Sequence, residues 1–310
     1  MRNRTLPETV PSELAPVNAA HLADFAAALA ARPAHTRAAY LRDVRALATL
    51  AQDADLARLA PAQLRRFLAT MHARGLSGRS LARALSSWRA FYRHLQDRDP
   101  SLAENPCAGL KAPKAPRKLP SALSPDEAVR LVEIDADDPV AVRDRALLEL
   151  AYSSGLRLAE LVGLDVDRVD LESGEVRVWG KGAKERIVPV GAAARDAVRA
   201  WLAARAGMTT ADPKALFVGR NGKRIAPRTI QRQLARWAQV QGLTRHVHPH
   251  MLRHSFASHV LQSSGDLRAV QEMLGHASIA STQVYTHLDF QHLAKAYDAA
   301  HPRAKKKRGK

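Results

Sequence analysis

Four side chains near the end of the chain combine the groups needed to cut and rejoin a phosphodiester. His250 and Arg253 come first, His276 follows, and Tyr285 closes the set within about forty residues. An arginine fork binds phosphate oxygens, an imidazole moves protons near neutral pH, and a tyrosine can act as a nucleophile. Their order and spacing predict phosphoryl transfer through a tyrosine.

The first of these residues stand on a helix predicted to begin near Pro249. At about 100° per residue, His250 and Arg253 share one face, whereas Leu252 and Phe256 share the opposite, core-directed face. A guanidinium beside an imidazole at a helix start is suited to phosphate, because backbone N–H groups and the helix dipole add to the attraction. We therefore expect both side chains to point into one site.

Other histidines crowd the same stretch, and a metal site is the competing interpretation. His248, His254 and His259 have no carboxylate or cysteine beside them at ligand spacing. We interpret these three as scaffold, and His250 and His276 as the residues that act.

Two further cations upstream complete the predicted site. Arg157 follows the helix-ending Gly155, where a long side chain can turn into a cleft, and Glu160 could steady it across one helical turn. Lys181 lies between two glycines at a hairpin tip, and lysine can release a proton to an alkoxide leaving group where arginine does so badly. Taken singly, each would be an ordinary surface residue.

A tyrosyl phosphodiester keeps the energy of the broken bond, so resealing needs neither ATP nor a metal. A phenol of pKa about 10 is a weak nucleophile unless nearby cations favour the phenolate, which two arginines can do. The chain has no phosphate-cradling glycine loop and no acidic cluster for magnesium. We therefore expect no cofactor and no metal.

Length and composition place these residues in a two-domain protein. The chain has 310 residues, no secretory signal, no apolar run long enough for a membrane span and a single cysteine, Cys107, interpreted as a packing residue. These features predict a cytoplasmic protein without disulfides.

The charge distribution predicts a polyanionic partner. Of the formal net charge of +18, residues 1–110 carry +6, residues 111–118 carry +4 and residues 303–310 carry +6. The remaining +2 leaves the second domain nearly neutral, so its basic groups must gather on one face if it binds nucleic acid. Arginine-rich composition with solvated charges is the alternative.

The predicted organisation starts with a four-helix bundle over residues 1–110, whose aromatic residues follow the apolar stripe and belong to its core. Residues 111–120 form a basic, proline-rich linker that either follows a phosphate backbone or acts as a spacer. Residues 121–302 form an α+β domain, opened by a capping box at Ser124 and containing a small antiparallel sheet with apolar pairs such as Ile187 and Val190. Residues 303–310 form a basic tail. The fold class is mainly α.

With these residues in place, the chain resembles the tyrosine recombinase (phage-integrase-type) family, in particular its Xer subfamily and the XerC branch. The resemblance covers nearly the whole chain. The motifs that carry it are Gly155-Leu156-Arg157-Leu158-Ala159-Glu160, Gly180-Lys181-Gly182, His248-Pro249-His250, Leu252-Arg253-His254, Leu274-Gly275-His276, Tyr285-Thr286-His287-Leu288-Asp289-Phe290 and the stretch 297–303.

The resemblance implies a SAM-like core-binding bundle followed by a catalytic domain, the two closing on duplex DNA. It also implies the roles of the residues. Tyr285 attacks the scissile phosphate to form a 3′-phosphotyrosine, His250 assists proton transfer and Lys181 protonates the leaving oxygen. The non-bridging oxygens are held by Arg157, Arg253 and His276.

The same resemblance implies the biological setting. Two XerC-like and two XerD-like protomers would form a heterotetramer on dif-type sites, resolving chromosome dimers at cell division with a septal DNA translocase of the FtsK type. Each protomer would pass its C-terminal helix, about residues 290–299, to a neighbour. Three alternatives stay open at this point: a type IB topoisomerase, a phage integrase, and a catalytically inactive DNA-binding relative.

Overall fold

The chain divides into two compact units, Met1–Lys118 and Leu119–Lys310, and each is described here by itself. Most of the predicted linker, residues 114–120, lies outside the part of the chain that this computed structural model describes. The described residues are 14–102, 104–113, 122–135, 137–179, 185–275, 293–294, 296–298 and 300–304.

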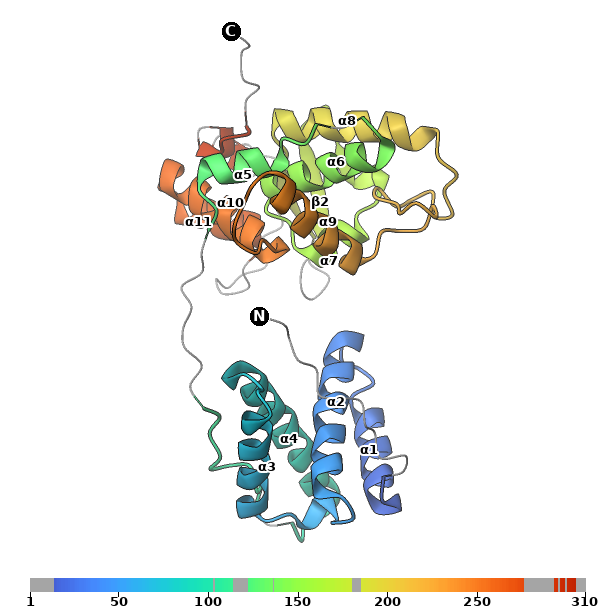
Figure 1. The fold of residues 1–310 in the computed structure, drawn as a ribbon, viewed down its shortest axis with the longest axis vertical. Helices are drawn as coiled ribbons and strands as arrows, with labels where there is room; N and C mark the ends of the chain where they lie inside the picture. The colour runs from blue at the N-terminus through green and yellow to red at the C-terminus, as the bar shows by residue number, and fades with distance from the viewer. Residues whose placement is uncertain are drawn as a thin grey trace. The chain divides into compact units, whose positions relative to one another are not determined.

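The first unit is a bundle of four α-helices, as predicted (Figure 1). Prolines occupy the first turns of two helices, where the missing N–H costs nothing, and the Ser77 hydroxyl accepts a hydrogen bond from the Ser80 N–H at 3.2 Å to cap a third. The elements are α1 (Pro16–Ala28), α2 (Ala34–Ala51), a short 3-10 helix (Leu56–Arg58), α3 (Pro61–Ala73) and α4 (Gly78–Arg98).

The aromatic residues of this bundle belong to its core, which confirms the prediction. Trp88, Phe91 and Tyr92 on α4 are buried. The Trp88 indole N–H donates to the Asp43 carbonyl oxygen at 3.0 Å, and the Tyr92 hydroxyl donates to the Leu56 carbonyl oxygen at 2.9 Å. With their polar atoms satisfied inside the bundle, these rings are not available to stack on bases.

Cys107 is buried against the same core, as expected of a packing residue. Burial raises the pKa of its thiol to about 12. The thiolate, which is the reactive form, is therefore scarce at neutral pH.

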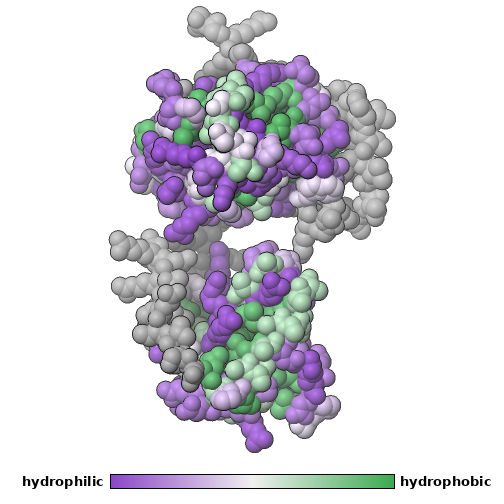
Figure 2. Space-filling model, turned by 90° about the vertical axis from the view of Figure 1, so that its right-hand side faces the viewer, coloured by the Kyte–Doolittle hydropathy of each residue, from purple (hydrophilic) through white to green (hydrophobic). Residues whose placement is uncertain are grey.

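Helix α1 leaves an apolar face in solvent. Ala19, Ala20, Ala23 and Ala27 are exposed on it, while Leu22 and Phe25 point inward. Figure 2 shows the pale green, weakly hydrophobic surface of the first unit on the side where α1 lies.

In the second unit, α6 (Pro139–Ser153) packs against α5, α8 and α10. The first helix of this unit opens with the predicted capping box, in which Ser124 and Glu127 exchange hydrogen bonds with each other's backbone N–H. The elements are α5 (Pro125–Val132), α6 (Pro139–Ser153), α7 (Leu158–Gly163), a 3-10 turn (Val166–Arg168), β1 (Val169–Asp170), β2 (Glu175–Trp179), β3 (Glu185–Pro189), α8 (Ala192–Ala206), α9 (Pro227–Val240), α10 (Pro249–Ser264) and α11 (Leu267–Leu274).

The three strands form the predicted antiparallel sheet, in the order β1-β2-β3. In β2, Val176 and Val178 face inward, alternating with exposed Arg177 and Trp179. Val178 pairs with Arg186 of β3, so an arginine occupies an inward-facing position.

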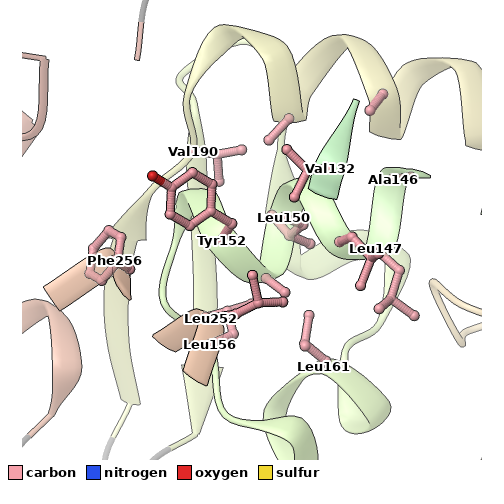
Figure 3. Close-up of a cluster of buried hydrophobic side chains, with 14 of the residues drawn as sticks. Val132, Ala146, Leu147, Leu150, Tyr152, Leu156, Leu161, Val190, Leu252 and Phe256 are labelled. Carbon is pink, nitrogen blue, oxygen red and sulfur yellow. The ribbon is translucent and has the colours of Figure 1, made fainter. Parts of the chain in front are cut away.

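A continuous apolar core joins α6 to α7 and α10 (Figure 3). Figure 3 shows Leu156 and Leu161, which follow α6, gathered with Leu252 and Phe256 of α10. Leu252 and Phe256 are 1% and 0% exposed, so α10 faces the core as its periodicity predicts. The opposite face of α10 carries His250 and Arg253, two of the predicted site residues.

The last described residues pack on the same unit. The Tyr297 hydroxyl lies 2.7 Å from the Ser153 hydroxyl, and Arg303 pairs with the buried Glu149 and with Glu133. Ala304 is also buried. Arg303 and Ala304, the first two residues of the predicted basic tail, thus pack on this unit.

Gly191 lies in close contact with the C-terminal part of the described chain. A Cβ placed there would lie 2.4 Å from the Arg303 carbonyl oxygen and 2.5 Å from the Tyr297 hydroxyl. Only glycine allows the backbone to approach so closely.

Within the described ranges, no helix combines the length and the apolar character that crossing a membrane would require.

Candidate active site

Helix α10 presents the first two predicted site residues one turn apart. His248 caps the helix, its Nδ1 accepting from the Met251 N–H at 3.2 Å, and Pro249 occupies the first helical position. His250 is exposed, whereas Arg253 is only 8% exposed. His248 is therefore scaffold, as predicted, and His250 has its imidazole open to solvent beside the capped helix start.

Two backbone carbonyl groups hold the Arg253 guanidinium in place. Its Nη1 donates to the Gly155 carbonyl oxygen at 2.6 Å, and its Nη2 donates to the Leu274 carbonyl oxygen. Burial, and after it the charge of Arg157, lower the pKa of this guanidinium to about 10. Arg253 therefore remains positively charged at neutral pH, with its position set by hydrogen bonds that hold it in place before any ligand arrives.

Arg157 lies at the start of α7, where Glu160 holds it twice. The Glu160 carboxylate accepts from the Arg157 backbone N–H at 2.7 Å and from its Nη1 at 2.8 Å, which confirms the predicted steadying role. Arg157 Nη2 also donates to the Gly275 carbonyl oxygen at 3.3 Å. About a third of the side chain stays exposed, enough to meet a ligand.

The structure thus brings Arg157 and Arg253 together at the end of α11, although about a hundred residues separate them in sequence. Gly275, which Arg157 contacts, directly precedes His276. Lys181, His276 and Tyr285 themselves lie outside the described residues, and their roles stay predictions.

Gly155 permits this arrangement. Its φ is +56°, and a Cβ there would lie 2.4 Å from the Phe256 ring. Glycine is required on both counts, because other residues avoid this conformation and the ring of a core residue leaves no room. The tight turn after α6 brings the Gly155 carbonyl within reach of Arg253.

Arg186 is a buried residue next to the site that sequence reasoning missed. It is 3% exposed, and its Nη1 and Nη2 donate to the two oxygens of Glu160, each at 2.8 Å. The apolar pattern of β3 drew attention to Ile187, whereas the strand buries Arg186 and Val188. The available signal was the two-residue alternation, which puts Arg186 on the same face as Val188.

One further histidine of α10, His259, lies on the core side, as predicted. His259 is buried, its Nδ1 lying 2.8 Å from the Tyr152 hydroxyl and its Nε2 lying 2.9 Å from the Leu123 carbonyl oxygen. Among the described residues, no group of three or more His, Cys, Asp and Glu side chains is arranged to hold a metal ion.

Helix α9 carries a stripe of positive charge. Arg228, Arg232 and Arg236 recur every four residues and are exposed, and the helix contains no acidic residue. Side chains four apart share one helix face. This face of α9 therefore carries three exposed cations, a pattern that favours binding of nucleic acid.

Two family models match the chain. The phage integrase family covers residues 121–292, more than half of the sequence. The N-terminal SAM-like domain of phage integrases covers residues 22–99. The two matches coincide with the two units of the structure.

Several relatives that share more than half of their residues with the chain are named tyrosine recombinase XerC. Tyrosine recombinase XerC 1 of Ralstonia nicotianae is 55% identical over 294 residues, covering 88% of this chain and 89% of that protein. Tyrosine recombinase XerC of Xanthomonas campestris pv. campestris is 56% identical over 278 residues, covering 89% and 85%. Tyrosine recombinase XerC of Pseudomonas aeruginosa is also 56% identical, covering 88% and 91%.

Solved structures of similar fold include DNA complexes. XerH recombinase in a pre-cleavage complex with its difH substrate is 25% identical, with a TM-score of 0.67 and coverage of 89% of this chain and 82% of that one. A lambda integrase dimer bound to a COC′ core site is 18% identical, with a TM-score of 0.67 and coverage of 86% and 99%, which supports the fold alone.

Proposed function

The chain belongs to the tyrosine recombinases of the phage integrase family and is a DNA recombinase, and from that premise we propose that it resolves chromosome dimers at dif-type sites. The observation that carries the proposal is identity of 55–56% to XerC proteins over almost the full length of both chains. A type IB topoisomerase or an inactive DNA-binding relative is not favoured by this similarity.

The proposed reaction exchanges one phosphodiester for another. The Tyr285 hydroxyl oxygen attacks phosphorus, the bond from phosphorus to the 5′ oxygen breaks, and a 3′-phosphotyrosine forms. Lys181 gives its proton to the departing 5′ oxygen, while His250 assists proton transfer at the phenol. A 5′-hydroxyl of the partner strand then reverses these steps and releases Tyr285.

The two arginines are proposed to bind the scissile phosphate in this reaction. Both guanidinium groups end near the last turn of α11, next to the position of His276 in the chain. Negative charge on the non-bridging oxygens grows in the transition state, so fixed donors stabilise it more than they stabilise the ground state. His276 is proposed as the third donor.

We also propose which parts of the chain bind DNA. The stripe on α9 supports binding of the duplex by the catalytic domain, residues 121–302, and residues 1–110 form the core-binding domain. We place the linker at 111–120 and the basic tail at 303–310, with Arg303 and Ala304, the first two tail residues, packed on the second unit. Because the substrate is the chromosome, the protein would act in the cytoplasm, with a septal DNA translocase of the FtsK type as a further partner.

A XerD-like recombinase is the proposed partner, and reconstitution tests this. On a dif-type duplex with two different half-sites, the purified chain should protect one half-site from nuclease. Exchange between two such duplexes should appear only after the second recombinase of the same cell is added. A duplex with one scrambled half-site serves as the control.

Exchange by the chain alone, at the same rate on the natural site and on a site built from two identical half-sites, would overturn the partner proposal. Failure to bind any dif-type duplex would overturn the proposed substrate. Neither result would bear on family membership.

Lys181 as the general acid predicts a chemical rescue. Lys181→Ala should slow cleavage about 100-fold, because the 5′ oxygen then leaves without a proton. A substrate with sulfur in place of that oxygen should be cleaved by Lys181→Ala at nearly the wild-type rate, because a thiolate needs no proton. Lys184→Ala, three residues further along the chain, is the matched control, and equal slowing of Lys181→Ala on both substrates would exclude Lys181 as the acid.

A further inference from the structure

A buried cation lies directly behind the arginines that are proposed to bind phosphate. Arg186 on β3 holds Glu160 through two parallel hydrogen bonds, and Glu160 in turn holds Arg157. Both Arg186 and the Glu160 carboxylate are less than a tenth exposed. Water therefore screens these charges little, and each strongly influences its neighbours.

The negative charge of Glu160 has two opposing effects on phosphate binding, and Arg186 offsets the unfavourable one. The carboxylate orients Arg157, but its negative charge also offsets the positive charge that a phosphate needs. Burial alone would raise the pKa of Glu160, yet hydrogen bonds and charge from Arg186, with help from Arg157, lower it to about 2. The carboxylate is thus ionised under all ordinary conditions, and its charge has to be balanced by another group.

The charge count shows how far Arg186 restores the balance. Arg157, Arg253 and Arg186 carry three positive charges against the one negative charge of Glu160, which leaves a net charge of two. Without Arg186 the same cluster would keep a net charge of one. A guanidinium is suited to this place because it stays protonated and bridges a carboxylate with two bonds.

Arg186 also fixes the end of helix α11. Its Nε donates to the Met273 carbonyl oxygen at 2.9 Å. Arg253 and Arg157 take the next two carbonyls, those of Leu274 and Gly275. Three arginines therefore satisfy three successive carbonyls at the negative end of the α11 dipole, directly before His276.

Gly275 fits closely against the same guanidinium. It has φ of +61° and ends α11, and a Cβ there would lie 3.1 Å from Arg186 Cδ. The Arg186 side chain thus sits between Glu160 on one side and the turn that leads into His276 on the other.

We propose that Arg186 is a positioning residue for DNA cleavage: it balances the charge of Glu160 and links Glu160 to the end of α11, so that Arg157 is oriented without loss of positive charge at the phosphate. This inference rests on the proposed phosphate-binding roles of Arg157 and Arg253. It goes beyond them in assigning the recombinase a residue that does not itself touch DNA.

The same unit offers a matched control. Arg143 on α6 is also buried, pairs with the buried Asp144 and donates to the Val218 carbonyl oxygen at 3.2 Å. It shares residue type, burial and bonding pattern with Arg186. None of its hydrogen bonds reaches Glu160, Arg157, Arg253 or α11.

The first measurement compares cleavage with DNA affinity and with stability. R186Q and R143Q are assayed as full chains on a nicked suicide substrate at saturating DNA, well below their melting temperatures. We expect R186Q to form the covalent adduct about 100-fold more slowly, because misplaced charge costs that much in transition-state binding. R143Q should cleave within about threefold of wild type despite a comparable fall in melting temperature. Affinity for duplex DNA should change much less than the rate in R186Q.

The second measurement asks whether Arg186 acts through Glu160. In the double variant E160Q/R186Q the buried negative charge is gone, so the net charge of two is restored by Arg157 and Arg253 alone. Its adduct should form about tenfold faster than that of R186Q, since coupled residues give non-additive effects. R186K keeps the charge but loses one bond, and should retain more activity than R186Q even if R186Q folds poorly.

The outcomes separate this inference from the proposed function. If wild type forms no adduct, the cleavage assignment fails first. If wild type forms the adduct but R186Q behaves like R143Q, or if E160Q/R186Q and R186K are each no faster than R186Q, Arg186 is a structural residue only and the inference is wrong.

Discussion

Tyr285→Phe should form no covalent adduct with a nicked suicide substrate, whereas the wild-type chain accumulates one in the presence of EDTA. Phenylalanine keeps the ring but lacks the oxygen that attacks phosphorus, so cleavage should fall by about 10⁴-fold or more. The adduct is measured as a band of retarded protein on a denaturing gel. Chelation should leave the wild-type reaction unchanged, because the proposed chemistry uses protein cations in place of a metal.

Tyr297→Phe is the matched control. Its hydroxyl contacts Ser153 inside the second unit, and burial raises the pKa of this phenol, which disfavours the phenolate. Tyr297→Phe should therefore form the adduct, with at most a lowered melting temperature. An adduct that survives in Tyr285→Phe would exclude Tyr285 as the nucleophile and reopen the choice among the tyrosines.

Arg253→Gln should impair both cleavage and folding, by different amounts. Removing one fixed donor from an anionic transition state costs about 10²–10³ in rate. The Gly155 and Leu274 carbonyls would also lose their donor, which costs about 1–3 kcal/mol of stability for each unsatisfied buried group. The measurements are single-turnover cleavage at saturating DNA and the free energy of unfolding from urea titration.

The comparison with R143Q separates these two effects. R143Q should lose a similar free energy of unfolding while it cleaves at nearly the wild-type rate. Stability loss in Arg253→Gln without loss of rate would mean that Arg253 holds α11 in place but does not bind the phosphate. Equal loss of rate in both variants would mean that general destabilisation explains the defect.

Local patterns predicted most of the fold. Contacts within one element can be predicted from the sequence. Examples are turn-forming glycines, prolines at helix starts and the apolar stripe of α4. The inward face of α10 followed from helical periodicity alone, as the burial of Leu252 and Phe256 confirms. The capping box at Ser124 was equally visible, since both partners lie within four residues.

Long-range ion pairs were not visible in the same way. Arg186 meets Glu160 across 26 residues, and Arg303 meets Glu149 across 154. The alternation of β3 puts Arg186 on the buried face, but in a chain with so many arginines nothing local shows which carboxylate Arg186 or Arg303 meets. The site was accordingly predicted as a set of residues that contact phosphate, without the cation behind them. Lys181, His276 and Tyr285 stay predictions from motif and chemistry.

The packing of Arg303 against α6 would affect how fast recombinase protomers exchange their C-terminal segments. Glu149 is fully buried, so its carboxylate depends on Arg303 for compensation. The exchange of C-terminal segments that the family resemblance implies would have to remove Arg303 from this site and supply a neighbour's arginine in its place. In a closed ring whose members all supply such an arginine, every pair would be remade and the exchange would be nearly neutral in free energy. Each transfer would nevertheless pass through a state with an unpaired charge in an apolar interior. The ion pair would therefore act as a kinetic barrier, making the ring slow to form and slow to come apart.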